Sequence, residues 1–303
     1  MTLPESLRNV LETTEPMRAT ELTALSDLPA AELQGRERAW VSAPPERRHG
    51  LLAALRSLAE DNVDLNFKTI YLLGLDDPSS EVRQAAIEGL WEDEGSALLE
   101  RLQGMLFSDP DPEVRAAAAT ALGRFAFLGA AGGLPSSRAD QLQEVLRRAL
   151  VDTSDGSAMQ RRLVEALAYF HDDGLVHEFI GRLYREGEEP EQESAVIAMG
   201  RSMDVRWRDV VVRELKNQDA GIRFQAARAA GEMQLMETVP ELSTLADELD
   251  PEVRSSAIWA LGQIGSKLAT DKLRLLAQSP AEDVREAAEE ALGEAMYASG
   301  YDG

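Results

Sequence analysis

The chain has 303 residues, and its 31 basic and 54 acidic side chains give a formal net charge of −23 at pH 7 with histidine neutral. A surface this acidic repels phosphate backbones and anionic lipid headgroups, which argues against nucleic acid or a membrane surface as a partner. The sequence contains no cysteine, so disulfides, thiol nucleophiles and thiolate metal sites are excluded.

Residues 1–43 carry short apolar-periodic pieces, at 3–11, 20–28 and 30–41, that prolines separate from one another. This pattern predicts an atypical helical cap at the N-terminal end of the fold. The first residues lack the basic region and apolar core of a signal peptide. Nowhere does the chain approach the run of about 20 apolar residues that a membrane-spanning helix needs. We therefore expect a soluble, cytoplasmic protein.

From residue 44 to residue 295 a short motif recurs along the chain. It reads Asp-Pro, one or more variable residues, Val-Arg and a segment with alanines that ends in Leu-Gly, as in 250–262. A fixed period of roughly 20 to 50 residues is typical of stacked structural repeats. Aligned on the motif arginine, eight places carry the following residues: Arg48, Arg83, Arg115, Gln160, Gln192, Arg223, Arg254 and Arg285.

Each repeat predicts two helices. Amphipathic stretches such as 96–107 and 267–277 precede the motif and predict the first helix, which we name helix A. The motif itself predicts the second, helix B, because Asp111 and Asp250 can cap free N–H groups and the next proline suits the first helical turn. The glycines after the leucine are expected to end helix B. They are Gly123, Gly200, Gly231, Gly262 and Gly293.

The longest spacing, between Arg115 and Gln160, contains extra residues. Because the stretch 128–137 is rich in glycine, proline and serine, we expect an insertion near residues 124–138 that forms a surface loop. Such a loop can be a binding lid or a tolerated insertion, and the sequence leaves both possibilities open. Residues 296–303 are expected to form a C-terminal tail.

The motif resembles HEAT repeats, in particular the short type named after phycocyanobilin lyase, over residues 44–295. The resemblance implies an all-α fold: an α-solenoid in which about eight two-helix repeats form a right-handed superhelix with helix B on the concave face. It also implies that turn aspartates and motif arginines form a hydrogen-bonded ladder between repeats, weakened where Gln160 and Gln192 replace arginine. The arginines concerned are Arg83, Arg115, Arg223, Arg254 and Arg285.

The last repeat carries a charged residue at a position that is apolar in the other repeats. The position four residues after the motif arginine is apolar in the other repeats, but in the last it is Glu289. Together with Glu286, Glu290 and Glu294 it predicts a polar C-terminal end, because nothing stacks beyond a terminal repeat. A carboxylate metal site is the competing interpretation, which is disfavoured because a run of glutamates is usually a solvated face.

Positions one, five and nine residues after the motif arginine should share the concave face of helix B. In the central and later repeats they carry aromatic, arginine and isoleucine side chains, and Trp, Tyr and Arg dominate binding hot spots. The competing interpretation is that the aromatic side chains only cover neighbouring helices. The predicted binding patch consists of Tyr169, Ile197, Arg201, Phe224, Arg228 and Trp259.

Candidates for catalysis are few. His171 and His177 with neighbouring acids could ligate a metal, but HEAT-like di-iron hydroxylases carry several His-Glu pairs and this chain has one, so we expect surface histidines. Phosphate-binding loops and nucleophile elbows are absent from the sequence. No catalytic residue, metal or cofactor is therefore assigned.

These features favour a non-catalytic scaffold that binds a protein or peptide of basic character on its concave face. The alternative is a HEAT-fold enzyme or chromophore-handling protein, similar to the lyase or to a metal-dependent hydroxylase.

Overall fold

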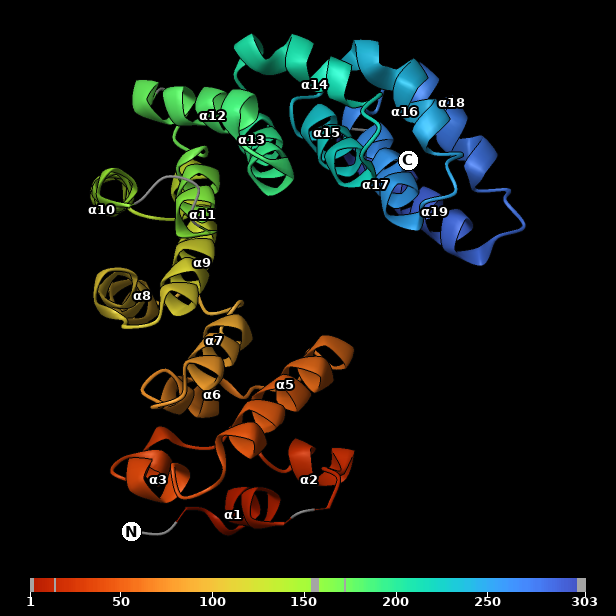
Figure 1. Ribbon diagram of the computed structural model, residues 1–303. Helices are drawn as coiled ribbons and strands as arrows, with labels where there is room; N and C mark the ends of the chain where they lie inside the picture. The colour runs from red at the N-terminus through yellow and green to blue at the C-terminus, as the bar shows by residue number, and fades with distance from the viewer. Residues whose placement is uncertain (1–2, 14, 154–157, 172, 299–303) are drawn as a thin grey trace. The chain divides into compact units, whose positions relative to one another are not determined.

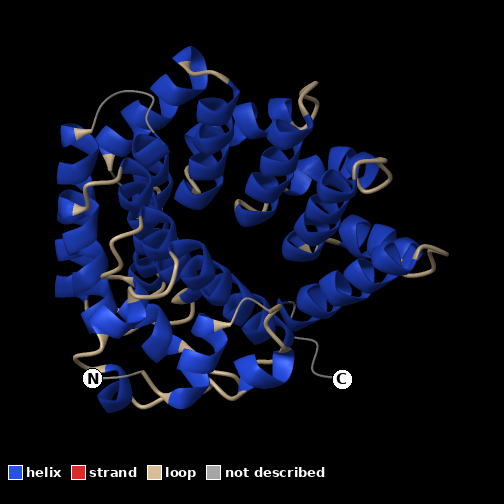
Figure 2. Cartoon of the chain, turned by 60° about the horizontal axis from the view of Figure 1, so that its bottom comes forward, coloured by secondary structure: helices blue, strands red, loops and turns tan. Residues whose placement is uncertain are grey.

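The computed structural model describes residues 3–13, 15–153, 158–171 and 173–298. These residues form α-helices and two short 3-10 helices, and no strand occurs among them (Figures 1 and 2). The expectation of an all-α solenoid is confirmed. The chain divides into two compact units, Met1–Phe125 and Ala126–Gly303.

The first unit begins with four short helices. They are α1 (Glu5–Glu12), α2 (Ala19–Thr23), α3 (Ala30–Leu33) and α4 (Glu37–Trp40). The longer helices that follow are α5 (Pro45–Asp61), α6 (Lys68–Gly74), α7 (Ser80–Gly89), α8 (Ser96–Ser108) and the start of α9 (Pro112–Ala130). Helices α1 and α2 pack against α5, and α3 packs against α6. The stretch expected as one piece at 30–41 is split into α3 and α4 at Gly35, whose φ is 73°.

The second unit alternates helix A and helix B. Its A helices are α10 (Ser136–Asp152), α12 (Gly174–Glu186), α14 (Arg208–Glu214), α16 (Val239–Leu245) and α18 (Lys267–Leu276). Its B helices are α11 (Ala158–Leu167), α13 (Glu189–Ser202), α15 (Ala220–Glu232), α17 (Pro251–Ile264) and α19 (Glu282–Ala298). Successive B helices pack side by side, and each A helix packs on the B helix that follows it (Figure 1). Two 3-10 turns, Val205–Trp207 and Met236–Thr238, lead into α14 and α16.

A ladder of guanidinium groups joins successive repeats. Nη1 of Arg83 donates to the carbonyl oxygen of Asp77, at 2.8 Å, in the turn before its own helix. Nε and Nη2 of Arg83 donate to the carboxylate of Asp109 in the turn of the next repeat, both at 2.8 Å. One side chain thus satisfies a turn and couples it to its neighbour, and charge-assisted bonds of this kind are the stronger class.

The same pattern recurs in the second unit. Arg223 donates to the carbonyl oxygen of Asn217 at 2.8 Å and, through Nε, to Glu248 at 3.2 Å. Arg254 donates to the carbonyl oxygen of Glu248 at 3.1 Å and to Asp283 at 2.9 Å. The ladder implied by the family resemblance is therefore present at these places.

The other members of the column contact their own turns. Arg115 donates to the carbonyl oxygen of Asp109 at 2.8 Å, and Arg285 to that of Ser279 at 3.2 Å. The side-chain amide of Gln192 donates to the carbonyl oxygen of Gly187 at 3.0 Å. An uncharged amide offers two donors on a single nitrogen, whereas a guanidinium offers five in a fork.

The first rung is the most buried. Nε and Nη2 of Arg48 each lie 2.7 Å from a carboxylate oxygen of Asp77, and the two side chains are 3% and 0% exposed. The indole Nε1 of Trp40 donates to the same carboxylate at 2.6 Å. Asp77 is therefore an ion held inside the protein by a cation and a further donor.

The motif glycines do not end helix B, contrary to the sequence-based expectation. Gly200, Gly231 and Gly262 lie inside α13, α15 and α17. A Cβ at Gly262 would lie 2.9 Å from the carbonyl oxygen of Ala291 on the next B helix. The glycines let neighbouring B helices approach closely, and α17 instead ends at Gly265, which has a φ of 57°.

The stretch expected as a surface loop is mainly helical, which corrects that expectation. Helix α9 continues to Ala130, and α10 begins at Ser136. Leucine and alanine around Gly129 favour the helical conformation, so the extra residues of this repeat lengthen α9 and α10. The short turn between them contains Gly132, with a φ of 78°.

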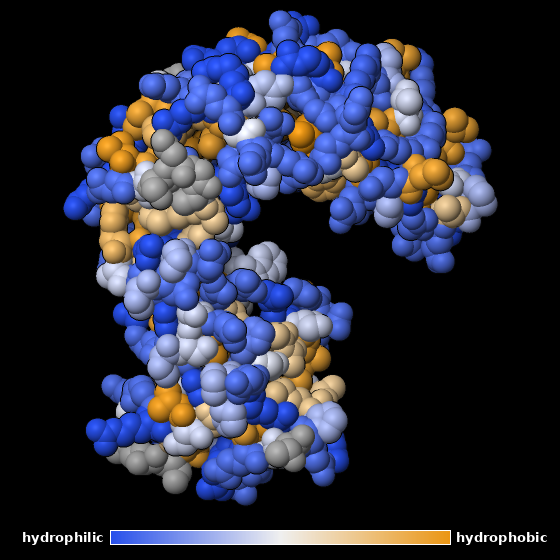
Figure 3. Space-filling model, in the orientation of Figure 1, coloured by the Kyte–Doolittle hydropathy of each residue, from blue (hydrophilic) through white to orange (hydrophobic). Residues whose placement is uncertain are grey.

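The C-terminal helix has the expected polar face. Glu286, Glu289, Glu290 and Glu294 are all exposed on α19. Residues 299–303 of the expected tail lie outside the described residues. Hydrophilic residues cover most of the surface visible in Figure 3, and none of the described helices is long and apolar enough to cross a membrane.

The glycine column can be tested at two equivalent positions. Gly262→Ala should lower the free energy of unfolding by about 1–3 kcal/mol, because the added methyl group meets the backbone of α19. Gly293→Ala should raise it by up to about 1 kcal/mol, because alanine is the better helix former and no described atom lies within 4 Å of the added Cβ. Urea unfolding followed by circular dichroism measures both, and equal effects would refute the packing role.

The ladder predicts unequal losses when single arginines are removed. Arg48→Met should lower the free energy of unfolding by about 3–5 kcal/mol, because it leaves the buried Asp77 carboxylate without its cation. Arg254→Met should lower the free energy of unfolding by only about 1 kcal/mol, because Asp283, the partner of Arg254, is 66% exposed. Thermal unfolding of the two variants makes the comparison, and a larger loss for Arg254→Met would contradict it.

Candidate functional site

The six residues of the predicted patch all lie on the helix-B layer of the second unit. Each is half-buried. Tyr169 follows α11, Ile197 and Arg201 lie on α13, Phe224 and Arg228 on α15, and Trp259 on α17. Large side chains at these positions are thus partly accessible, where alanine would suffice to keep the helix.

Two of the arginines stack on aromatic rings of the patch. Cζ of Arg228 lies 3.8 Å from the centroid of the Trp259 ring, and Cζ of Arg201 lies 5.2 Å from that of Tyr169. Such cation–π contacts hold both partners in place and contribute about 0.5–2 kcal/mol. Nη1 of Arg201 also donates to the carbonyl oxygen of Glu165 at 3.1 Å.

Two further residues extend the patch that the sequence predicted. Phe127 on α9 is 51% exposed, and its ring makes an edge-on contact with Tyr169 at 5.5 Å between centroids. Glu232 at the end of α15 is half-buried, and this burial raises its pKa, while Arg201 and Arg228 lower it. Phe127 was missed because α9 was expected to end before it. The aromatic–arginine row, as we name it, comprises Phe127, Tyr169, Arg201, Glu232, Arg228 and Trp259.

A pocket of about 310 Å³ opens at one end of this row. Phe224, Arg228 and Trp259 line it from α15 and α17, and Glu290 and Glu294 line it from α19. The Trp259 ring can pack closely against α15 because Gly231 has no side chain: a Cβ there would be 2.8 Å from the ring. The pocket therefore combines an aromatic wall with two carboxylates.

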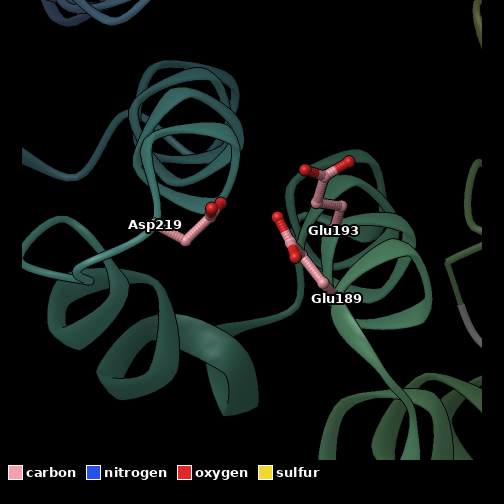
Figure 4. Close-up of side chains that lie close together, drawn as sticks. All are labelled: Glu189, Glu193 and Asp219. Atoms are coloured by element: carbon pink, nitrogen blue, oxygen red, sulfur yellow. The ribbon is translucent and has the colours of Figure 1, made fainter.

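Three carboxylates from two repeats form a second cluster (Figure 4). Glu189 and Glu193 lie on α13, and Asp219 caps α15 by accepting from the N–H of Ile222 at 2.9 Å. One oxygen from each carboxylate lies within 4.8 Å of the others, an arrangement that attracts a cation. No local sequence pattern indicates this cluster, because its members come from separate repeats. We name this cluster the acidic triad.

One of the two candidate histidines differs from the sequence-based expectation of surface histidines. His177 on α12 is buried, not at the surface, with Nε2 lying 3.1 Å from the carbonyl oxygen of His171 and 3.4 Å from Asp204. It lies on the buried side of α12 with Val176 and Ile180. His171 itself is exposed. The pair links the end of one repeat to the next through these contacts.

The family of HEAT repeats matches residues 70–148 and 209–293. The chain belongs to this family. No curated protein matches it. Similar solved structures include human deoxyhypusine hydroxylase, with 19% identity, coverage of 88% of this chain and 97% of that chain, and a TM-score of 0.39. An engineered protein has 20% identity, coverage of 95% and 87%, and a TM-score of 0.43. Kap95p, which binds RanGDP, has 14% identity, coverage of 96% and 45%, and a TM-score of 0.45.

In this HEAT-repeat array the folded state disfavours ionisation of two carboxyl groups of the acidic triad. The hydrogen bond with Asp219 raises the pKa of Glu189, and burial followed by the charge of Asp219 raises that of Glu193. A raised pKa in the folded state means that the carboxylate favours folding below its ordinary range, and that this contribution is lost as the pH rises through the folded-state pKa.

Glu193→Gln should therefore stabilise the protein at pH 7, by about 0.5 kcal/mol, and the gain should shrink at pH 4, where the wild-type carboxylate takes up its proton. Urea unfolding at the two pH values measures this difference. Glu286→Gln on the exposed face of α19 changes the net charge equally and serves as the control. A gain that persists unchanged at pH 4 would contradict the assignment.

Proposed function

We propose that this HEAT-repeat chain is a non-catalytic scaffold that binds a protein or peptide of basic character on the exposed face of its helix-B layer. The observation that carries the proposal is the pocket at the end of the aromatic–arginine row, with Trp259 and Phe224 beside Glu290 and Glu294.

The row supports binding because its large side chains are held in position before any partner arrives. Arg228 stacks on Trp259, Arg201 stacks on Tyr169, and the Glu232 carboxylate attracts both arginines. Side chains that are already ordered lose little conformational entropy on association. Tryptophan, tyrosine and arginine are also the residues in which binding energy is concentrated at protein interfaces.

The pocket supports a basic partner through its charge. A lysine or arginine side chain can lay its aliphatic stem against Phe224 and Trp259 and bring its cationic end to Glu290 and Glu294. The net charge of −23 adds a long-range field that raises the association rate of cationic ligands. This field weakens with salt, whereas contacts inside the pocket are screened less.

The alternative, a HEAT-fold enzyme or chromophore-handling protein, makes a distinct prediction. It requires a bound metal or an absorbing chromophore in the protein purified from its host. Elemental analysis and an absorption spectrum test this directly. A stoichiometric metal or chromophore would favour the alternative over the scaffold.

The scaffold proposal predicts a specific loss of affinity on removal of Trp259. Peptides selected from a random displayed library with the purified full chain should be enriched in lysine and arginine. Trp259→Ala should weaken binding of the selected peptides by at least about tenfold, because the wall of the pocket is removed. Isothermal titration calorimetry measures the loss.

Two further variants separate binding from folding. Trp91→Ala removes a tryptophan that is 56% exposed and does not belong to the lining of the pocket, and it should leave the affinity unchanged. The double variant Glu290→Lys and Glu294→Lys reverses two exposed charges without altering the core. It should weaken the binding of basic peptides as strongly as Trp259→Ala does. Selected peptides that lack basic residues, or that bind all variants equally, would refute the proposal.

A further inference from the structure

The repeat that contains α7 departs from the others at two positions. Six residues after the motif arginine, seven repeats carry alanine and this one carries Gly89. Two residues later, where five repeats carry glycine, stands Trp91. Helix α7 also ends at Gly89, whereas α15 and α17 continue past the equivalent alanines to Glu232 and Ile264. Helix α7 is therefore shorter than these two helices by about one turn.

Gly89 makes room for an aromatic side chain of the neighbouring helix A. A Cβ at this position would lie 2.1 Å from Cε1 and 2.4 Å from Cζ of Tyr71 on α6. Atoms in a close-packed interior do not approach one another so closely, so the alanine of the other repeats would push the Tyr71 ring aside. The exchange of alanine for glycine thus accounts for the position of the ring.

A pocket of about 260 Å³ opens beside the Tyr71 ring. Trp91 and Val63, both largely exposed, contribute apolar surface to its lining. Every residue of the lining belongs to the first unit. The volume lies below the roughly 300–1,000 Å³ of sites for drug-sized ligands, so the pocket suits a molecule of one ring with a short substituent.

The hydroxyl of Tyr71 is buried without a hydrogen-bond partner. Tyr71 is only 3% exposed, and no described residue offers its Oη a donor or an acceptor. Burial raises the pKa of this phenol, so the hydroxyl keeps its proton and remains a donor. A buried polar group without a partner destabilises the folded state, and a ligand with an acceptor atom would remove this effect.

The charged groups around the pocket favour a neutral ligand. Nζ of Lys68 lies 3.0 Å from Oδ1 of Asp93, and the Arg56 guanidinium pairs with Glu88 on α7. Glu92, the remaining charged residue of the lining, is exposed to solvent. An ionic ligand would therefore meet two ion pairs and one solvated carboxylate, which do not offset the loss of its own hydration.

We propose that this pocket, which we name the Tyr71 pocket, binds a small uncharged aromatic molecule whose acceptor atom pairs with the hydroxyl of Tyr71. The ligand ring packs against Trp91, and aromatic pairs contribute more than their buried area alone. Its acceptor, such as a carbonyl oxygen, accepts the hydrogen bond from Oη. The inference goes beyond the proposed function and does not rest on it, because this pocket belongs to the other unit and selects a ligand without charge.

Access to the hydroxyl requires the movement of one side chain. Other atoms cover Oη. Burial raises the pKa of Tyr71 while the Arg56 charge lowers it, so the guanidinium lies near the hydroxyl as well as in the lining of the pocket. The carboxylates that pair with Arg56, Glu60 and Glu88, are both exposed. Such surface ion pairs hold a side chain weakly, so we expect the ligand to displace Arg56 readily.

Three probes of the same shape test the class of ligand. Benzamide is neutral and carries a carbonyl acceptor, benzamidinium is a cation without an acceptor, and benzoate is an anion. Benzamide should bind the full chain about tenfold more tightly than either ion. Ligand-observed NMR titrations measure the three affinities. Equal or tighter binding of either ion, or no binding of benzamide, would overturn the inference.

The hydroxyl is tested by removing it alone. Tyr71→Phe should weaken benzamide binding about three- to tenfold. It should also raise the midpoint of thermal unfolding by about 2–4 °C, because it removes a buried group that has no partner. Tyr184→Phe, the matched control, removes a hydroxyl that donates to Glu214, so it should lower the midpoint and leave benzamide binding unchanged. Unchanged benzamide affinity in Tyr71→Phe would refute the proposed hydrogen bond.

Variants around the pocket test its other parts. Trp91→Ala should weaken benzamide binding about three- to tenfold, because it removes the aromatic wall. Arg56→Ala should bind benzamide at least as tightly as the wild type, because no guanidinium has to move. Weaker binding by Arg56→Ala would contradict its role as a cover.

The pocket of the second unit provides the last control. Trp259→Ala should leave benzamide binding unchanged, since Trp259 does not line the Tyr71 pocket. If Trp259→Ala abolishes benzamide binding and Tyr71→Phe does not change it, the probe binds beside Trp259 and the inference fails. The affinity of Trp259→Ala for basic peptides tests the scaffold proposal separately.

Discussion

The guanidinium that spans two successive turns is the interaction on which the structure depends. The B helices meet through alanine and glycine, as at Gly262 and Ala291, and such flat contacts allow close packing but specify the alignment weakly. The arginine adds direction, because its nitrogens must reach a carbonyl on one side and a carboxylate on the other. At the first rung the Asp77 carboxylate is fully buried, so the alignment there is enforced by the large free energy needed to leave that charge without its cation.

The same small-residue packing determines where large side chains can lie. Trp259 rests on α15 because Gly231 leaves room for its ring, and Arg228 then covers the ring at 3.8 Å. A residue that permits close helix packing thus also shapes the wall of the pocket. The packing between B helices consequently determines which positions on the face of the helix-B layer can carry large side chains. These positions are the ones at which the neighbouring helix offers space.

The sequence predicted those features that are repeated along the chain. The period, the two helices of each repeat, the capping aspartate Asp250 and the arginine column follow from local patterns that can be read without knowledge of the neighbouring repeat. The errors concern contacts between repeats. Gly200 was assigned to a helix end because its packing against Ala229 cannot be seen in a local pattern, and His177 was placed at the surface because its acceptors lie in other turns. The acidic triad was missed for the same reason.

Places where the chain departs from the repeat pattern can specify a partner, which an acidic surface alone cannot do. A field of 23 net negative charges attracts every cationic ligand and is screened beyond about 8–10 Å at physiological salt, so it distinguishes poorly between one basic segment and another. On the scaffold proposal the pocket beside Trp259 distinguishes better, because its aromatic wall can hold the stem of one basic side chain while Glu290 and Glu294 hold its cationic end. The rung between Arg223 and Glu248 joins the turns before α15 and α17, the helices that carry Phe224 and Trp259. The ladder thus aligns the two helices between which, on our proposal, a basic side chain of the partner is bound.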